Sequence, residues 1–454
     1  MKRLILVLIA VWLGALLLSG CQTDAVSSDT SGGTESGTSA PGGDTEGDKL
    51  LPALQPTGKK VTYLTWDNAD ELADPTTGWY EINELMKQKY GCELEFVYSN
   101  YADLATKLVT SVLSKAAPDL VKYKSQDNPN NIYKDLVQSV DGLIDFDSEL
   151  WKGVREINDR YLVNGKHYVA VTKTYNGGVI FYNTAMFDEN AVETPLDLYK
   201  KGEWTWSKLE EIAKQLTVDS DNDGIVDVYG WEGHPLYVYP TCGVDYVKVD
   251  DKGKFVNNMR DPVIAEAMNF ILRTGFSGSD CRALSLNGEN NFANKKTAIF
   301  WDERWRISTY AEQIKNGEIG IAPTPKMDGA DQYYVSAGGE MTWIAKGAKN
   351  TQGALAYLNI LRYMETDEAT VARLKAKSKD AFGYSDDMMA LFDEMDSDKF
   401  TLVFPRASSV GEWGNSAMWE LWNEVGVYEV PWTSVLEKYY PILQSEIEAA
   451  NSES

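Results

Sequence analysis

The chain has 454 residues, of which 43 are Lys or Arg and 68 are Asp or Glu, so its formal net charge at pH 7 is −25. This acidic balance excludes a nucleic-acid-binding protein, because no basic patch offsets the repulsion from phosphate. A hydrophobic content of 43% is typical of a globular protein, and a chain of this length suggests two domains.

The first residues have the pattern of a secretion signal. Two basic residues precede an apolar run from Leu4 to Leu18, which is too short to span a bilayer comfortably. Two small residues and then Cys21 follow at the position where a lipoprotein signal is cut, since the thiol accepts a diacylglyceryl group whose two chains anchor a protein stably. We therefore expect a lipoprotein signal peptide over residues 1–20; a plain secretory signal with a coincidental cysteine is the alternative.

Residues 21–58 are predicted to be a lipid-anchored flexible linker. Apart from one Ala and one Pro, the stretch from Ser28 to Gly47 contains only Ser, Gly, Thr, Asp and Glu. Such a segment has no large apolar side chain whose burial could offset its ordering entropy. It would hold a globular body near the extracellular face of the cell membrane.

Strand and helix patterns alternate after the linker. Residues 61–66 and 94–98 read as strands rich in β-branched and aromatic side chains, and a third strand starts at Pro118. Apolar residues at helical spacing fill residues 82–90 and 104–112 between them. Strands that alternate with helices in this way predict a parallel sheet covered by crossover helices.

Aromatic and polar side chains follow the carboxyl ends of these three strands, where ligands of such sheets bind. A sugar ring packs its CH face on an aromatic plane while its hydroxyls bind amides or carboxylates. The alternative for each aromatic residue is a place in the core. The candidate ligand-binding residues in this part of the chain are Trp66, Asp67, Tyr98, Asn100 and Tyr123.

An acidic loop starts at Asp219 and has the spacing of a calcium-binding loop. Carboxylates stand at relative positions one, three, five and nine, and a Gly at six permits the sharp turn. A cation would relieve the repulsion among these carboxylates, and its role would be structural. Position twelve is Gly230 rather than a bidentate Glu, so water or another residue such as Glu232 would complete the site; an acidic turn without metal is the alternative. The predicted Ca²⁺ ligands are Asp219, Asp221, Asp223, Ile225 through its backbone carbonyl, and Asp227.

The remaining cysteines are Cys92, Cys242 and Cys281, with no CxxC spacing. We expect buried reduced thiols, because cysteine is a common core residue; a Cys242–Cys281 bridge is the alternative. With only 2 histidines in the chain, a histidine-rich zinc or manganese site is excluded.

Six segments of the chain, in their order and spacing, resemble family 1 extracellular solute-binding proteins, the ligand receptors of ABC sugar importers. In the segment that starts at Glu203, Thr205 is a candidate helix N-cap, and the helix that follows has a buried face from Leu209 to Leu216. The resemblance covers residues 59–450, and the acidic loop is similar to that of alginate-binding members except at position twelve. The segments are Gly165–Val171, Gly178–Phe187, Glu203–Leu209, Ala298–Trp301, Ile319–Pro325 and Ile344–Asn350.

The resemblance implies an α/β protein with a two-lobed, hinged, periplasmic-binding-protein-like fold of type II. Each lobe would be a mainly parallel sheet flanked by helices. The implied N-terminal lobe holds residues 59–168 plus about 338–402, and the C-terminal lobe holds residues 169–337 plus about 403–450. The lobes would close on a ligand by a hinge motion. The implied crossings lie near Val169–Val171, Val335–Gly338 and Val403–Arg406.

Further candidate ligand-binding residues belong to the hinge and the second lobe. For Asn176 a simple turn is an equal alternative, and the helical spacing of Trp419 and Trp422 favours the core for both. The candidates are Asn176, Trp231, Tyr237, Trp301, Asp302, Gly339, Glu340 and Trp413.

The resemblance implies a monomeric receptor, not an enzyme, that captures a carbohydrate, in our interpretation an oligosaccharide, and delivers it to ABC permease subunits with a separate ATPase. An anchored glycoside hydrolase or lyase is one alternative, since many carboxylates are present, although no GxSxG, HExxH or P-loop occurs. A ligand-sensing partner of a signalling receptor is another. The aromatic and acidic candidates favour a neutral sugar, with polyamines and amino acids left open; Arg304, Arg306 and Arg406 are unplaced, and a guanidinium clamp would select uronates.

Overall fold

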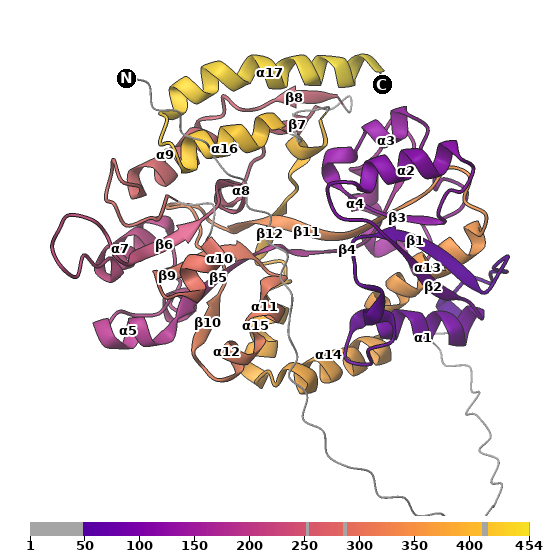
Figure 1. The fold of residues 1–454 in the computed structure, drawn as a ribbon, viewed down its shortest axis with the longest axis horizontal. Helices are drawn as coiled ribbons and strands as arrows, with labels where there is room; N and C mark the ends of the chain where they lie inside the picture. The colour runs from indigo at the N-terminus through magenta and orange to yellow at the C-terminus, as the bar shows by residue number, and fades with distance from the viewer. Residues whose placement is uncertain (1–48, 251–253, 285–287, 411–415, 454) are drawn as a thin grey trace, which may run out of the picture. The chain divides into compact units, whose positions relative to one another are not determined.

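The computed structural model describes residues 49–250, 254–284, 288–410 and 416–453 (Figure 1). The predicted signal peptide, most of the linker, the anchor residue Cys21 and the candidate Trp413 lie outside the described residues. Thr45–Ser454 form one compact unit, and the side chains of this unit pack into cores that belong to two α/β lobes.

The first lobe is built on a six-stranded sheet with the order β12-β11-β3-β1-β2, and β4 pairs with β11 as well. This sheet continues into the second lobe, where β12 pairs with Tyr333–Ser336 at the start of β11 and Phe400 packs in the second-lobe core. The parallel pairing of β1 with β2 and β3 confirms the predicted strand–helix–strand arrangement. β11 runs antiparallel to β3 and β4. The strands are β1 (Lys60–Thr65), β2 (Glu93–Tyr98), β3 (Leu120–Lys122), β4 (Val169–Asn176), β11 (Tyr333–Ile344) and β12 (Phe400–Val403).

Helices cover both faces of this sheet. Side chains of β1 alternate between two cores, so that Val61 and Tyr63 lie in one and Leu64 lies in the other. The helices and short 3₁₀ turns of this lobe are η2 (Ala69–Leu72), α1 (Gly78–Tyr90), α2 (Leu104–Leu113), η3 (Ser125–Asp127), α3 (Asn130–Tyr133), η4 (Lys152–Val154), α4 (Arg155–Asp159) and α13 (Thr351–Thr366).

The second lobe contains a four-stranded sheet with the order β10-β5-β9-β6. Only β6 and β9 are parallel, whereas β5 runs antiparallel to both β9 and β10, so this sheet is mixed and not mainly parallel as expected. The strands are β5 (Gly178–Asn183), β6 (Tyr229–Gly233), β9 (Thr297–Glu303) and β10 (Ile319–Ala322), beside a hairpin of β7 (Val247–Val249) and β8 (Phe255–Asn257).

Helix α7 forms as predicted. The Thr205 hydroxyl accepts a hydrogen bond from the backbone N–H of Lys208 at its start, and Leu209, Ile212, Ala213 and Leu216 are buried. The helices and 3₁₀ turns of the second lobe are α5 (Thr184–Asn190), α6 (Pro195–Lys200), α7 (Trp206–Leu216), α8 (Pro235–Val238), η5 (Tyr239–Cys242), α9 (Pro262–Thr274), α10 (Gly288–Ala293), α11 (Arg306–Thr309), α12 (Ala311–Lys315), α15 (Asp386–Met395), η6 (Arg406–Ser409), α16 (Met418–Gly426) and α17 (Trp432–Glu453).

Strands β4 and β11 connect the lobes as an antiparallel pair in which Ala337 lies opposite Asn176. The third connection is helix α14 (Glu368–Phe382), which runs between α13 of the first lobe and α15 of the second (Figure 1). Tyr384, Leu391 and Phe400 already pack in the core of the second lobe. The chain therefore returns to that lobe before the Val403–Arg406 segment named from the sequence.

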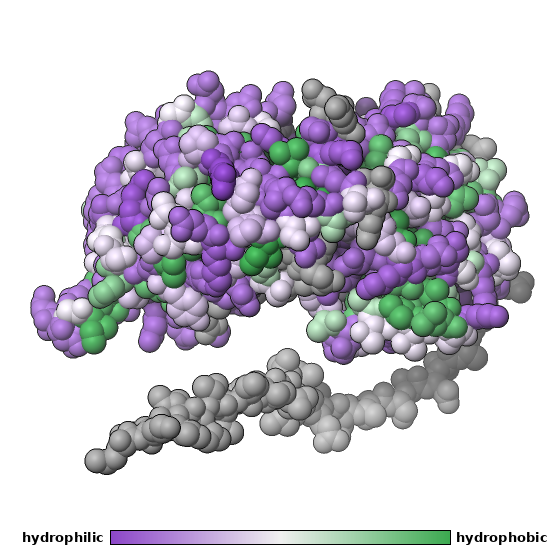
Figure 2. Space-filling model, turned by 90° about the horizontal axis from the view of Figure 1, so that it is seen from above, coloured by the Kyte–Doolittle hydropathy of each residue, from purple (hydrophilic) through white to green (hydrophobic). Residues whose placement is uncertain are grey.

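The structure describes three free cysteines, Cys92, Cys242 and Cys281, and all of them are buried, as predicted. No helix among the described residues is both long enough and apolar enough to cross a membrane. The face drawn in Figure 2 is largely hydrophilic, with small separate hydrophobic patches.

Candidate functional site

Two aromatic side chains meet at the carboxyl edge of the first-lobe sheet. Trp66 follows β1, and Tyr101 comes three residues after the end of β2; the register pairs Thr65 with Tyr98, so the two strands end together. The ring centroids of Trp66 and Tyr101 are 5.0 Å apart at an interplanar angle of 64°, an edge-to-face arrangement that aromatic pairs favour. The pair forms a half-exposed aromatic wall, since 47% of the Tyr101 side chain is exposed.

An ion pair fixes the polar groups beside this wall. Lys122, the last residue of β3, places its Nζ 2.7 Å from both carboxylate oxygens of Asp67. The Thr65 hydroxyl donates a further hydrogen bond of 2.5 Å to the same carboxylate. Lys122 also lies 4.8 Å from the ring centroid of Trp66, within cation–π range. The carboxylate and the ammonium are therefore held next to the aromatic face.

Tyr101 is held in place from a third strand end. Its hydroxyl donates to the side-chain oxygen of Gln126 at 2.8 Å, and Lys124 lies 4.6 Å from its ring centroid. Burial raises the pKa of Tyr101, and the negative charges of Asp127 and Glu303 contribute to the shift. Glu303 ends β9 of the second lobe, so a carboxylate of the second lobe acts on this ring of the first lobe.

The facing side of the second lobe also combines an aromatic ring with carboxylates. The Trp305 side chain is 56% exposed, and its indole N–H donates to the carboxylate of Glu303. The guanidinium of Arg306 lies 4.6 Å from the Trp305 ring and forms ion pairs with Asp302 and Glu289. Burial raises the pKa of Asp302 to about 6, against the opposing effect of Arg306, and it also raises the pKa of Glu303.

A small pocket of about 190 Å³ lies beside these residues and is lined by His234, Tyr237, Asp302, Arg306 and Trp419, among others. Trp419 packs edge-to-face against Trp422 at 5.3 Å, but 40% of its side chain is exposed, whereas Trp422 is buried. Helical spacing therefore assigns Trp422 to the core correctly and fails for Trp419, because the face of α16 that carries Trp419 is only partly covered.

The hinge contributes charge between the two walls. Desolvation by the surrounding protein raises the pKa of Glu340 in β11, and the charges of Lys122 and Asp67 also act on it. Burial raises the pKa of Tyr175 in β4 to about 12, with contributions from Glu340 and Glu303. Glu340 itself is solvent-exposed, and it lies opposite Lys173 in the pairing of β11 with β4.

Of the candidate residues, Trp66 and Asp67 lie at the carboxyl edge of the first-lobe sheet, Tyr237 and Asp302 line the pocket of the second lobe, and Glu340 lies in the hinge strand β11. The chain also places Gly339 in the hinge, where an added Cβ would lie 2.8 Å from the Met341 side chain.

Three candidates have local structural roles. Asn100 accepts a hydrogen bond from the backbone N–H of Asp103 at the start of α2. Tyr123 packs against Trp343, with centroids 4.7 Å apart. The Asn176 side chain is fully buried and accepts a hydrogen bond from the Gly178 N–H.

Tyr98 ends β2 beside Thr65, Trp301 lines the pocket of Tyr237 and Asp302, and Trp231 is buried in the second-lobe core. The Tyr98 ring is 61% exposed, and no ring contact fixes it among the described residues. Trp231 and Trp301 have no exposed surface, and Trp231 stacks on Phe270 at 5.6 Å. They lie within the second-lobe sheet, where residues before the strand end are covered by helices.

Four residues of these two surfaces are not among the candidates named from the sequence: Tyr101, Lys122, Glu303 and Trp305. All four lie at a strand end or within three residues of one, and the same rule that selected Trp66 would have found them. The Glu303-Arg304-Trp305 run, directly after an apolar strand, was the clearest available signal.

The acidic loop brings three of its carboxylates together. Oxygen atoms of Asp219, Asp221 and Asp227 lie within 4.8 Å of one another. The Oδ1 atom of Asp219 is buried and has no hydrogen-bond partner, so a bound cation would satisfy it. Gly224 has φ +86°, which supports the predicted sharp turn.

Asp223 and Glu232 lie outside this cluster. The Asp223 carboxylate accepts a hydrogen bond from the backbone N–H of Ile225. The buried Glu232 carboxylate accepts hydrogen bonds from Asn291 and Thr297. The carboxylates of Asp219, Asp221 and Asp227 fit a calcium ion. Glu232 does not complete this site, because its carboxylate is engaged in other hydrogen bonds.

Solved structures with the same fold are binding proteins. An ABC substrate-binding protein from Listeria monocytogenes, in complex with cycloalternan, has a TM-score of 0.61 at 17% identity and covers 87% of this chain and 98% of its own. The GacH receptor of Streptomyces glaucescens GLA.O, solved unliganded and with acarbose, has a TM-score of 0.60 at 18% identity, with coverage of 87% and 98%. The maltose/maltodextrin-binding domain MalE from Bdellovibrio bacteriovorus, bound to maltotriose, has a TM-score of 0.58 at 16% identity, with coverage of 86% and 99%.

No curated protein matches the chain significantly. The family described as bacterial extracellular solute-binding protein matches residues 82–378, which is more than half of the 454 residues. The chain therefore belongs to the bacterial extracellular solute-binding proteins.

Proposed function

We propose that the protein is an extracellular solute-binding lipoprotein that captures a carbohydrate, an oligosaccharide in our interpretation, by hinge closure and delivers it to an ABC importer. The observation that carries this proposal is the pair of facing walls, each with an aromatic ring beside fixed carboxylates: Trp66 and Tyr101 with Asp67, and Trp305 with Glu303. Aromatic faces receive the CH surface of a sugar, and the carboxylates accept hydrogen bonds from its hydroxyls.

The charge balance of the cleft favours a neutral sugar over a uronate. Lys122 is paired with Asp67, Arg304 with Asp396, and Arg306 with both Asp302 and Glu289. A carboxylate ligand would have to compete with these ion pairs for a guanidinium. The sugar oligomers in the complexes of the similar structures, such as maltotriose, support the same class.

Binding by closure needs no bond to break. The protein would act as a monomer, with permease subunits and a separate ATPase as its partners, and the linker would keep it near them. Asp302, the most strongly shifted carboxyl of the pocket, is held by Arg306, so it is not a free acid for glycoside hydrolysis. We expect a bound sugar to be recovered intact.

The proposal is tested by isothermal titration calorimetry of the soluble body against maltotriose, a uronate trimer and a polyamine, with chromatography of the recovered ligand. We expect one sugar class to bind at one site, and Trp66→Ala and Trp305→Ala each to weaken it by about tenfold to a hundredfold. Phe276→Ala is the matched control, since its ring is 68% exposed and lines neither the cleft nor any pocket described here. Recovery of cleaved sugar would contradict the proposal that the protein is a receptor. Equal losses of affinity in all three variants would contradict the location of the sugar site in the cleft.

The lipid anchor is proposed from Cys21 in the sequence. The full chain, expressed in a bacterium that processes lipoproteins, should partition into the membrane fraction, and Cys21→Ser should release it. Membrane retention of the Cys21→Ser variant would contradict the anchor without affecting the sugar site.

A structural Ca²⁺ ion in the loop that starts at Asp219 is a second proposal. Its support is the clustering of Asp219, Asp221 and Asp227 around the unsatisfied Asp219 oxygen. When bound, the ion would neutralise these carboxylates and fix the turn between α7 and β6.

A further inference from the structure

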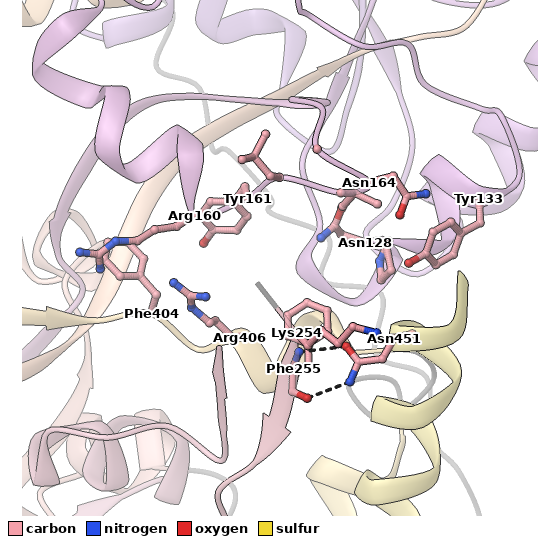
Figure 3. A pocket seen from close by; sticks show the side chains of 15 residues that line it. Asn128, Tyr133, Arg160, Tyr161, Asn164, Lys254, Phe255, Phe404, Arg406 and Asn451 are labelled. Atoms are coloured by element: carbon pink, nitrogen blue, oxygen red, sulfur yellow. Dashed lines mark hydrogen bonds between the residues drawn. The ribbon is translucent and has the colours of Figure 1, made fainter. Parts of the chain in front are cut away.

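A second pocket, of about 460 Å³, lies between the lobes and contains none of the cleft residues (Figure 3). Its first-lobe side comes from the segment after η3 and from residues 160–165. Its second-lobe side comes from β8, from the segment between β12 and η6, and from the end of α17. The hydrogen bonds between Asn451 and the backbone of Phe255, 2.8 and 2.9 Å long, fix α17 to β8 at its base.

The pocket has an apolar body. Phe255 and Phe404 of the second lobe face Tyr133 and Tyr161 of the first (Figure 3). Leu162 also lines the pocket. A cavity of this size with mainly aromatic and aliphatic walls suits a small organic molecule.

The charged groups of the pocket all have one sign. Arg160, Lys254 and Arg406 line it, and none of the 15 lining residues is acidic. The lining thus has three cations in a chain with a net charge of −25, and the one with a carboxylate partner outside the pocket is Arg160, paired with Glu156. Such a field attracts an anion.

The Arg406 guanidinium is a charged group of this pocket without a hydrogen-bond partner among the described residues. Its side chain is half-buried and makes no ion pair or hydrogen bond with any described residue. Burial lowers its pKa, and the positive charge of Arg160 lowers it further. The nearby Asp245 carboxylate is engaged by the Tyr239 hydroxyl and by the backbone N–H groups of Tyr246 and Ala407. Arg160 also lies 5.5 Å from the Phe404 ring, so cation and aromatic face are combined in one wall.

A buried amide on the opposite side also lacks a partner. Asn128 is only 5% exposed, its Oδ1 atom has no hydrogen-bond partner, and it lines the same pocket. This oxygen is an acceptor, so a hydroxyl or an N–H group could satisfy it, whereas a carboxylate oxygen would not. The support for an anion in this cavity therefore comes from Arg406 and not from Asn128.

We propose that this pocket is a second ligand site, which binds a carboxylate attached to an apolar body. The carboxylate would accept charge-assisted hydrogen bonds from Arg406. Arg160, which is also paired with Glu156 at 2.5 Å, would add its positive charge. The apolar part would pack against Phe404, Phe255 and Leu162. Because both lobes line the pocket, its occupant would contact both at once. The inference is independent of the sugar proposal, since the two sites share no residue.

Calorimetry with octanoate on the sugar-free protein tests this site, with 1-octanol and acetate as probes for each half of the ligand. We expect one octanoate to bind per chain. The affinities for octanol and for acetate should each be at least about tenfold lower, since about tenfold is what one charge-assisted contact contributes. Equal affinity for octanol would overturn the role of the arginines. Equal affinity for acetate would overturn the apolar body.

Variants locate the site. Arg406→Gln and Arg160→Gln should each weaken octanoate binding by about tenfold, and Arg160→Gln keeps the test valid if the buried Arg406 is needed for folding. Arg260→Gln is the matched control, because it removes the same charge from an arginine that packs on Tyr440 outside this pocket. Equal losses in all three variants, or binding that does not saturate at one per chain, would overturn the proposal.

Discussion

Lys122 Nζ lies 2.7 Å from both carboxylate oxygens of Asp67, and this ion pair holds the polar groups at the edge of the first-lobe sheet next to Trp66. The side chains are only 22% and 15% exposed, so neither charge is well solvated without the other. The same ion pair therefore stabilises the first lobe and holds the side chains beside Trp66 in position.

Replacing Lys122 should destabilise the protein through the charge left behind. Lys122→Met leaves Asp67 largely buried without its ammonium partner, and we expect the free energy of unfolding to fall by about 1–3 kcal/mol. Urea unfolding measures this loss. Lys60→Met is the control, because the Lys60–Glu93 pair is more exposed and should contribute less than about 1 kcal/mol. Equal losses would mean that burial of the pair has no effect.

His234 should make stability depend on pH. Burial and the charge of Arg282 lower its pKa from 6.5 to about 4, and its Nδ1 accepts the N–H of Leu236, which needs a neutral ring. The unfolded chain therefore binds the proton first. The stability that depends on a neutral His234 is fully present above pH 6.5 and is lost as the pH falls towards 4. The loss in unfolding free energy is on the order of 2–3 kcal/mol.

The measurement is the difference in unfolding free energy between wild type and His234→Asn across this pH range. Asn can replace the ring as an N-cap but does not titrate. The two proteins should diverge as the pH falls from 6.5 to 4, with the wild type losing more. Parallel curves would contradict the assigned pKa.

Gly177 should tolerate no side chain. It joins β4 to β5, its N–H donates to the Ser336 carbonyl at 2.8 Å, and a Cβ would lie 3.0 Å from both that oxygen and the Gly338 nitrogen. Since both neighbours are backbone atoms of the hinge, Gly177→Ala should cost about 1–3 kcal/mol in urea unfolding. Gly58→Ala, where nothing lies within 4 Å, should change stability by less than about 0.5 kcal/mol.

Calcium should stabilise the folded protein. At a Ca²⁺ concentration 100 times the dissociation constant, the gain is about 2.7 kcal/mol, visible as a higher Tm that a chelator reverses. Asp219→Asn should abolish the gain, whereas Asp188→Asn, at an exposed carboxylate outside the cluster, should keep it. A Tm that does not respond to Ca²⁺ would contradict the proposed site.

The sequence by itself determined the elements and their class. Helix α7 with its Thr205 cap and the parallel strands β1 and β3 follow from local patterns, because caps and hydrophobic periodicity are properties of neighbouring residues. The strand ends also place Trp66 and Asp67 at the carboxyl edge of the first-lobe sheet, as the pattern predicts.

Only the tertiary structure decided which aromatic residues are covered. Trp301 and Trp305 are four residues apart, yet one is fully buried and the other is 56% exposed, because helices pack over the strand and stop where it ends. The meeting of Trp66 with Tyr101, and of Tyr101 with the charge of Glu303, joins residues from three strand ends and two lobes. Periodicity tells which face of an element is apolar, but the partner that covers or faces it is set by contacts between segments far apart in the chain.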